Sequence, residues 1–166
     1  MSILVGFPLL MILVMVQSAF VSNFMLLHGS ADIVLLTIIS WALQERVDTA
    51  WHWAVIGAVL VSIPSALPFY ALLAGYLLAT GITLLLRRRV WQRPILAMLV
   101  STFFGSLISL MINWGILYLG GHPLPLLSSL NLIIVPSLIL NLLLSIVVYT
   151  LVGGLAEQLY PEVIEA

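Results

Sequence analysis

The sequence predicts an all-α, polytopic membrane protein with about six transmembrane helices. Its 166 residues are 63% hydrophobic and only 7% charged, and the mean hydropathy is +1.27. A soluble domain with a water-facing surface does not have this composition. The apolar runs are continuous and lack the polar–apolar alternation of outer-membrane barrel strands, which favours helices. Since a spanning helix takes about 20 residues, the chain is long enough for about six.

The few polar residues exclude several classes of function. The net charge is −1 with five basic residues, so the chain offers no basic surface for nucleic acid. It has no cysteine, which excludes disulfides and thiolate chemistry. Phosphate-binding loops, nucleophile elbows and zinc-protease motifs are all missing. We therefore expect no enzyme activity, no cofactor and no metal site.

We predict one transmembrane domain over residues 1–156 and a short acidic cytoplasmic tail over residues 157–166. The predicted helices are Ile3–Val21, Ala31–Leu43, Thr49–Ile63, Pro68–Leu86, Pro94–Leu119 and Leu130–Leu151. Prolines and glycines break the chain at 64–68 and 120–125, and Gly153-Gly154 mark the end of the last helix. The first run lacks the basic start of a secretory signal, so we expect it to be retained.

The second predicted helix is too short to cross a membrane. At about 1.5 Å per residue, Ala31–Leu43 falls short of a hydrocarbon core of about 30 Å. We expect it to be tilted into a thinned region, packed deep against its neighbours, or extended backwards through Phe24–Leu27. Ser30 or Asp32 is suited to cap its first turn.

One arginine cluster sets the expected orientation. Arg87, Arg88, Arg89 and Arg93 lie between two long apolar runs, and short loops rich in arginine stay in the cytoplasm. With six spans, the fifth basic residue, Arg46, falls on the same side. Both termini are then cytoplasmic, and these five arginines form a cytoplasmic anchor.

Aromatic residues fit the same orientation. Four tryptophans, Trp41, Trp51, Trp53 and Trp91, fall beside the two cytoplasmic loops. We expect them to form a belt at the membrane–water interface, where amphipathic rings are enriched. Trp114 and Tyr118 are expected to serve the opposite face.

Small and polar residues recur at helical spacing in three predicted spans. The stripes are Ala71, Gly75 and Ala79; Ser101, Gly105, Ser109 and Asn113; and Ser137, Asn141 and Ser145. In lipid, helices associate through close backbone approach at small residues and through hydrogen bonds between helices. These stripes are candidates either for packing inside the bundle or for contact with a partner helix or a ligand.

A few polar groups are candidates for buried contacts. The amides expected at membrane depth are Gln17, Asn113 and Asn141, and each needs a buried partner, either structural or a substrate. Asp32, the one acid expected on the outer side, is a helix cap or has a pairing or proton role. His28 and His122 are also outside, but no local spacing motif makes them metal ligands.

Several short motifs are similar to those of a known family. They are Gln17-Ser18 at the end of the first helix, Ala31-Asp32-Ile33-Val34-Leu35-Leu36, Ala74-Gly75-Tyr76-Leu77 leading into Arg87-Arg88-Arg89, and Pro136-Ser137-Leu138-Ile139-Leu140-Asn141-Leu142-Leu143 continuing to Tyr149. In order and spacing the chain resembles the bacterial rod shape-determining protein MreD. It departs from that pattern at Ala31, where proline is frequent, and at Val61-Ser62, where an acid often ends the third helix.

The resemblance implies a function that composition does not. It implies a non-enzymatic scaffold of the cell-elongation complex in the bacterial cytoplasmic membrane. The implied partners are membrane lipids, MreC and, through or beside it, MreB and RodA with a class B penicillin-binding protein. The family shares its layout with the substrate-binding components of energy-coupling-factor vitamin transporters, which is the alternative function. Those proteins dock through an Ala-x-x-x-Ala face on the first helix, whereas Gly6–Val14 here is dominated by bulky residues.

Overall fold

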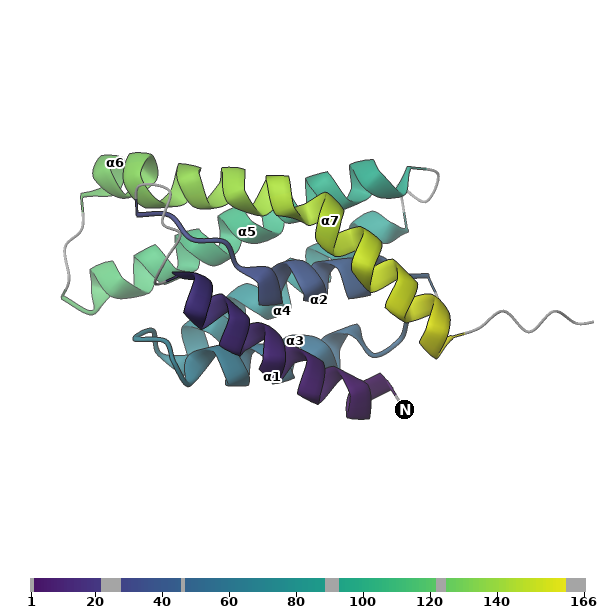
Figure 1. The fold of residues 1–166 in the computed structure, drawn as a ribbon. Coiled ribbons are helices and arrows are strands. Elements are labelled where there is room, and N and C mark those ends of the chain that lie inside the picture. The colour runs from purple at the N-terminus through teal and green to yellow at the C-terminus, as the bar shows by residue number, and fades with distance from the viewer. Residues whose placement is uncertain (1, 22–27, 46, 89–92, 122–124, 161–166) are drawn as a thin grey trace, which may run out of the picture.

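The computed structural model describes residues 2–21, 28–45, 47–88, 93–121 and 125–160, and every regular element in these ranges is a helix. The elements are α1 (Ser2–Val21), α2 (Ile33–Leu43), α3 (Ala50–Ser62), α4 (Phe69–Arg87), α5 (Pro94–Leu119), α6 (Leu126–Ser129), η1 (Leu130–Ile134) and α7 (Val135–Leu159). They form one bundle in which α1 and α7 lie on the near side of α2 (Figure 1).

Three helices are long and apolar enough to cross a membrane. They are α4 with 19 residues, α5 with 26, and the continuous helix Leu126–Leu159 with 34, which joins α6, η1 and α7. The other apolar helices in the described chain are α2 and α3, with 11 and 13 residues, and α1, of which the span Leu4–Ala19 is apolar. These lengths fit an all-α membrane protein. The predicted positions of the helices ending at Ile63, Leu86 and Leu119 agree with the structure to within one residue at that end.

The short helix α2 is the centre of the bundle. Each of its residues from Val34 to Leu43 is buried, and it contacts α1, α3, α4, α5 and α7. Of the three arrangements expected for this short helix, the structure shows deep packing against neighbours. The predicted backward extension of this helix runs through Phe24–Leu27, and this segment lies outside the described residues.

Arg87 closes the C-terminal end of α2 from the neighbouring helix α4. Its Nη1 donates to the carbonyl oxygens of Ala42 (3.2 Å), Gln44 (2.8 Å) and Val47 (3.2 Å). The last carbonyls of a helix have no partner within it, and a cation there also interacts favourably with the helix dipole. One of the predicted anchor arginines therefore also holds the loop between α2 and α3.

The last helix is longer than predicted at both ends. It begins at Leu126 and continues through Gly153-Gly154 to Leu159, so the predicted limits of 130 and 151 are wrong. Glycine weakens a helix by only about 1 kcal/mol, and Val152 before the two glycines and Ala156 after them are both buried against the core. The helix also includes the start of the predicted tail, while 161–166 lie outside the described residues.

Pro136 explains the irregular turn η1 within this helix. Proline has no N–H for the carbonyl four residues earlier, and such interruptions favour a wider turn. The five residues before Val135 form a π-helical turn, in which the N–H of Val135 donates to the Leu130 carbonyl. The Leu132 carbonyl, four residues before Pro136, accepts the N–H of His28 at 3.2 Å.

The predicted tryptophan belt is wrong for two of its members. Trp41 and Trp53 are fully buried, and their rings stack with centroids 4.2 Å apart. They pack α2 against α3 inside the bundle, where stacked aromatic pairs stabilise beyond their buried area. Trp51 is 45% exposed, as a belt residue would be, and Trp91 lies outside the described residues.

The small-residue stripes lie inside the bundle. All of their members except Asn113, which is half-buried, are buried. A Cβ atom at Gly75 would lie 2.7 Å from Ser109 Oγ and 3.2 Å from Ser109 Cα, and one at Gly105 would lie 3.1 Å from Ala79 Cβ. The glycines therefore allow the close approach of α4 and α5.

Candidate functional site: a buried polar network beside a cavity

The non-helical segment 28–32 is bound along η1 and α7 through alternate backbone N–H groups. His28, Ser30 and Asp32 donate to the Leu132 carbonyl (3.2 Å), to Ser137 Oγ (3.1 Å) and to Asn141 Oδ1 (2.8 Å). Two residues of extended chain rise about 6.6 Å, and four or five helical residues rise about 6–7.5 Å. Because the two distances match, acceptors one helical turn apart on η1 and α7 can bind every second N–H group of the segment.

Gly29 allows this segment to lie directly on α7. A Cβ atom at position 29 would lie 2.7 Å from both Pro136 Cβ and the Ser137 nitrogen. The nitrogen belongs to the backbone and cannot move aside. The segment that positions Asp32 therefore requires glycine here.

Asp32 lies at the junction of this segment and α2. Its Oδ1 accepts the N–H of Leu35 at 2.9 Å, so it caps α2 as predicted. The Tyr76 hydroxyl lies 2.8 Å from both of its carboxylate oxygens. Tyr76 comes from α4 and is fully buried. The acid therefore caps a helix and also pairs with a side chain of another helix.

Two of the predicted amides complete the network. Asn141 accepts from the Asp32 N–H and donates from Nδ2 to Ser106 Oγ at 2.9 Å, which joins α7 to α5. The Gln17 Oε1 accepts the N–H of Val34 at 3.1 Å, which joins α1 to the first turn of α2. Both amides thus have the buried partners that membrane depth requires.

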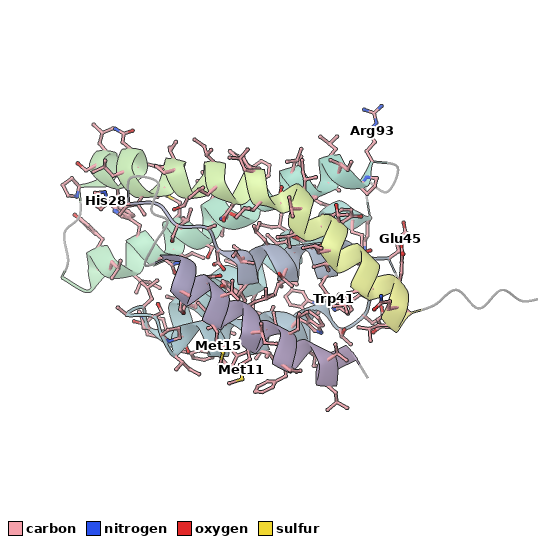
Figure 2. All side chains as sticks on the ribbon, in the orientation of Figure 1. Met11, Met15, His28, Trp41, Glu45 and Arg93 are labelled. Carbon is pink, nitrogen blue, oxygen red and sulfur yellow. The ribbon has the colours of Figure 1, made fainter. Side chains whose placement is uncertain are left out.

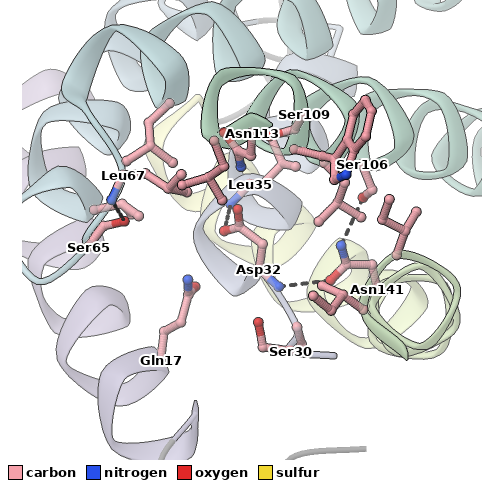
Figure 3. A pocket seen from close by; sticks show the side chains of 18 of the residues that line it. Gln17, Ser30, Asp32, Leu35, Ser65, Leu67, Ser106, Ser109, Asn113 and Asn141 are labelled. Carbon is pink, nitrogen blue, oxygen red and sulfur yellow. Dashed lines mark hydrogen bonds between the residues drawn. The ribbon is translucent and has the colours of Figure 1, made fainter. Parts of the chain in front are cut away.

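A cavity of about 290 Å³ lies beside the network. Its described lining residues are Gln17, Ser30, Ala31, Asp32, Leu35, Val61, Ser65, Leu67, Leu72, Ser106, Ser109, Leu110, Asn113, Trp114, Leu117, Ser129, Ile133, Ile134 and Asn141. The close-up shows Gln17 directed toward Asp32, with Asn113 and Ser109 along one wall and Asn141 on another (Figure 3). All three predicted amides and Asp32 therefore line one space.

Asn113 differs from the other two amides. Its Oδ1 is buried but has no hydrogen-bond partner among the described residues. An unpartnered buried acceptor costs about 1–3 kcal/mol. The other such atoms in the described chain, on Ser40, Trp53, Ser101 and Thr102, do not belong to the cavity lining.

The predicted anchor arginines and His28 are not among the described residues that line the cavity. Arg93 and Glu45 lie at one end of the bundle and His28 at the opposite end (Figure 2). Arg88 and Arg93 are exposed, and Arg46, Arg89 and His122 lie outside the described residues. Within the described ranges, no group of three acidic or histidine side chains is arranged to hold a metal ion.

Sequence reasoning did not single out Tyr76 and Ser106 as site residues. Tyr76 appears there only as part of a motif. The signal that could have found it is its hydroxyl, which in the middle of an apolar helix must find a buried partner. Ser106 is separated by 35 residues from Asn141. Its neighbours Ser101, Gly105 and Ser109 were assigned to the stripe because their spacing is regular, and Ser106 falls outside that spacing.

The fold and the site define a helical membrane protein with a polar network that adjoins a cavity. Comparison of the chain with protein-family models, with curated proteins and with solved structures finds no match.

Proposed function

We propose that this chain is a non-enzymatic integral-membrane scaffold of the bacterial cell-elongation complex, as its resemblance to MreD implies. In this role it binds MreC and, beside it, MreB and the synthase pair of RodA and a class B penicillin-binding protein. Such a scaffold stabilises one arrangement of its partners through differential contacts and needs no chemistry of its own.

The observation that supports the proposal is the meeting of the resemblance motifs in space. Gln17, Asp32, Tyr76 and Asn141 come from four motifs spread over the chain. Gln17 and Asn141 each bind a backbone N–H of the 32–34 turn, and Tyr76 binds the Asp32 carboxylate. Motifs selected only for their similarity to a family therefore contain the residues that join α1, α2, α4 and α7.

We further propose six spans, with both termini in the cytoplasm of a bacterial cell. The charged residues Arg93 and Glu45 lie at one end of the bundle, together with the start of α1 and the end of α7 (Figures 1 and 2). This is the arrangement that an even number of spans produces. The exposed Arg88 and Arg93 then face anionic lipid or a filament, and each arginine near an anionic leaflet contributes about 1 kcal/mol.

The experiment is a pull-down from native membranes in mild detergent, with the tagged chain produced at its natural level. The scaffold proposal predicts recovery of MreC together with RodA and a class B penicillin-binding protein. A tagged multi-span protein of unrelated function serves as the control for non-specific recovery. Recovery of ATP-binding-cassette ATPases with a retained vitamin, and of no cell-wall protein, would overturn the proposal.

The second candidate is a substrate-binding component of an energy-coupling-factor type transporter. The cavity lined by polar residues favours it, because ligand sites are concave, largely apolar and contain a few convergent polar groups. Against it, the exposed residues of α1 are bulky, among them Leu4, Phe7 and Met11. Under this candidate Asn113→Leu weakens ligand binding, whereas under the scaffold proposal it changes only stability or assembly.

A further inference from the structure

The charge of the cavity points to the kind of molecule that fits it. Asp32 is the one ionisable residue among the described residues that line the cavity, and no lysine, arginine or histidine is among them. Acidic residues at membrane depth normally face a partner or a pathway, because an uncompensated charge there is costly. The carboxylate of Asp32 accepts from Leu35 and Tyr76, both neutral donors.

Asn113 provides another hydrogen-bond acceptor in the same cavity. Asn113 Oδ1 is buried and unpartnered among the described residues, and both Asn113 and Asp32 belong to the lining. An occupant that contacts both would donate more than one hydrogen bond, and a positive charge on it would compensate the Asp32 carboxylate. A primary ammonium group has three N–H donors and one positive charge.

We propose that this cavity binds a primary ammonium group, supplied either by a small free amine or by the headgroup of an aminophospholipid. The volume of about 290 Å³ lies at the lower end of the range for ligand sites, which suits a headgroup-sized molecule. This site does not depend on the scaffold proposal. It names a ligand class for the second candidate.

The first test uses the purified full-length chain in detergent with ethanolamine as the probe. Thermal unfolding is followed at increasing ethanolamine concentration, with ethylene glycol as the neutral probe of equal size and sodium chloride at matched ionic strength. We expect ethanolamine to raise the unfolding temperature with a saturating dependence that the two controls lack. Equal effects of all three would mean that the cavity holds water only, and would overturn the proposal.

Two substitutions test whether ethanolamine binds in this cavity. Asn113→Leu removes the unpartnered acceptor at similar volume, and we expect the half-saturating ethanolamine concentration to rise at least about tenfold, equivalent to one lost hydrogen bond. Asn131→Leu is the matched control because Asn131 is exposed and does not line the cavity. An unchanged half-saturating concentration in Asn113→Leu overturns the proposal.

The second arm distinguishes the two sources of the ammonium group. The chain is placed in nanodiscs of phosphatidylcholine with or without phosphatidylethanolamine at constant acyl composition. Stabilisation by phosphatidylethanolamine that is lost in Asn113→Leu assigns the site to a lipid headgroup. Stabilisation by ethanolamine alone assigns it to a free amine. The scaffold pull-down is independent of both arms, so failure of one proposal is distinct from failure of the other.

Discussion

The Tyr76 hydroxyl lies 2.8 Å from each carboxylate oxygen of Asp32, and this contact joins the first turn of α2 to the middle of α4. Replacing Tyr76 by phenylalanine keeps the ring and removes only the hydroxyl donor. We expect Tyr76→Phe to lower stability by about 1–2 kcal/mol, because a buried acceptor loses a partner at membrane depth. Thermal unfolding of the purified protein in detergent measures this loss.

Tyr70→Phe is the control for this substitution, since Tyr70 lies on the same helix and is 63% exposed. Its effect should stay within about 0.5 kcal/mol. Combining Tyr76→Phe with Asp32→Ala should give less than the sum of the two single effects, because each substitution removes the same hydrogen bond. Additive effects would show that the contact contributes nothing to stability.

Arg87 should matter for stability although its neighbour Arg88 should not. Arg87 donates to three carbonyls at the end of α2, whereas Arg88 is exposed. We expect Arg87→Met to destabilise by about 1.5–3 kcal/mol, the usual worth of hydrogen bonds to a charged group. Arg88→Met removes the same charge at the adjacent position and should leave the unfolding temperature nearly unchanged. Equal shifts for both would mean that only the charge of the loop matters.

Gly75 should not tolerate even a methyl group. A Cβ at this position would lie 3.2 Å from Ser109 Cα, a backbone atom, whereas one at Gly115 would meet nothing within 4 Å. We expect Gly75→Ala to cost about 1–3 kcal/mol by separating α4 from α5. Gly115→Ala should leave stability unchanged or raise it by up to about 1 kcal/mol. The same unfolding measurement compares the two, and a stable Gly75→Ala variant would exclude the close helix contact.

The proposed six-span orientation can be tested with single cysteines, since the chain has none of its own. Ala66 and Glu45 are exposed in the two loops that flank α3. A membrane-impermeant maleimide should label Ala66→Cys in intact spheroplasts, and Glu45→Cys only after permeabilisation. Labelling of both positions in intact spheroplasts would place both loops outside, so that α3 would not span.

The sequence predicts where helices form more reliably than which way their residues face. Proline and the arginine cluster limit α4 and α5 through local chemistry, so these helices could be placed to within one residue of the structure. Trp41 and Trp53 could not be assigned, because a helix that is apolar on all sides carries no periodic signal for its buried face. Their position near a charged loop is equally compatible with an interfacial belt and with a stacked pair in the core.

For the candidate site, too, the sequence predicts which residues need a partner but not which partner each one has. The polarity of Gln17, Asn113 and Asn141 in apolar helices predicts that each needs a partner, and Gln17 and Asn141 have one. Which partner depends on contacts between distant segments, such as the Asp32–Asn141 contact across 109 residues. No local pattern encodes such a pairing.

Depletion of the chain from its native cells tests the proposed scaffold function most directly. Cell shape and the sites of new peptidoglycan are imaged during depletion, with re-expression of the wild-type chain or Tyr70→Phe as the control. The scaffold proposal predicts that depleted cells lose their elongated shape and insert wall material without spatial order, and that re-expression restores both. Cells that keep their shape and wall pattern after the chain has disappeared would contradict it.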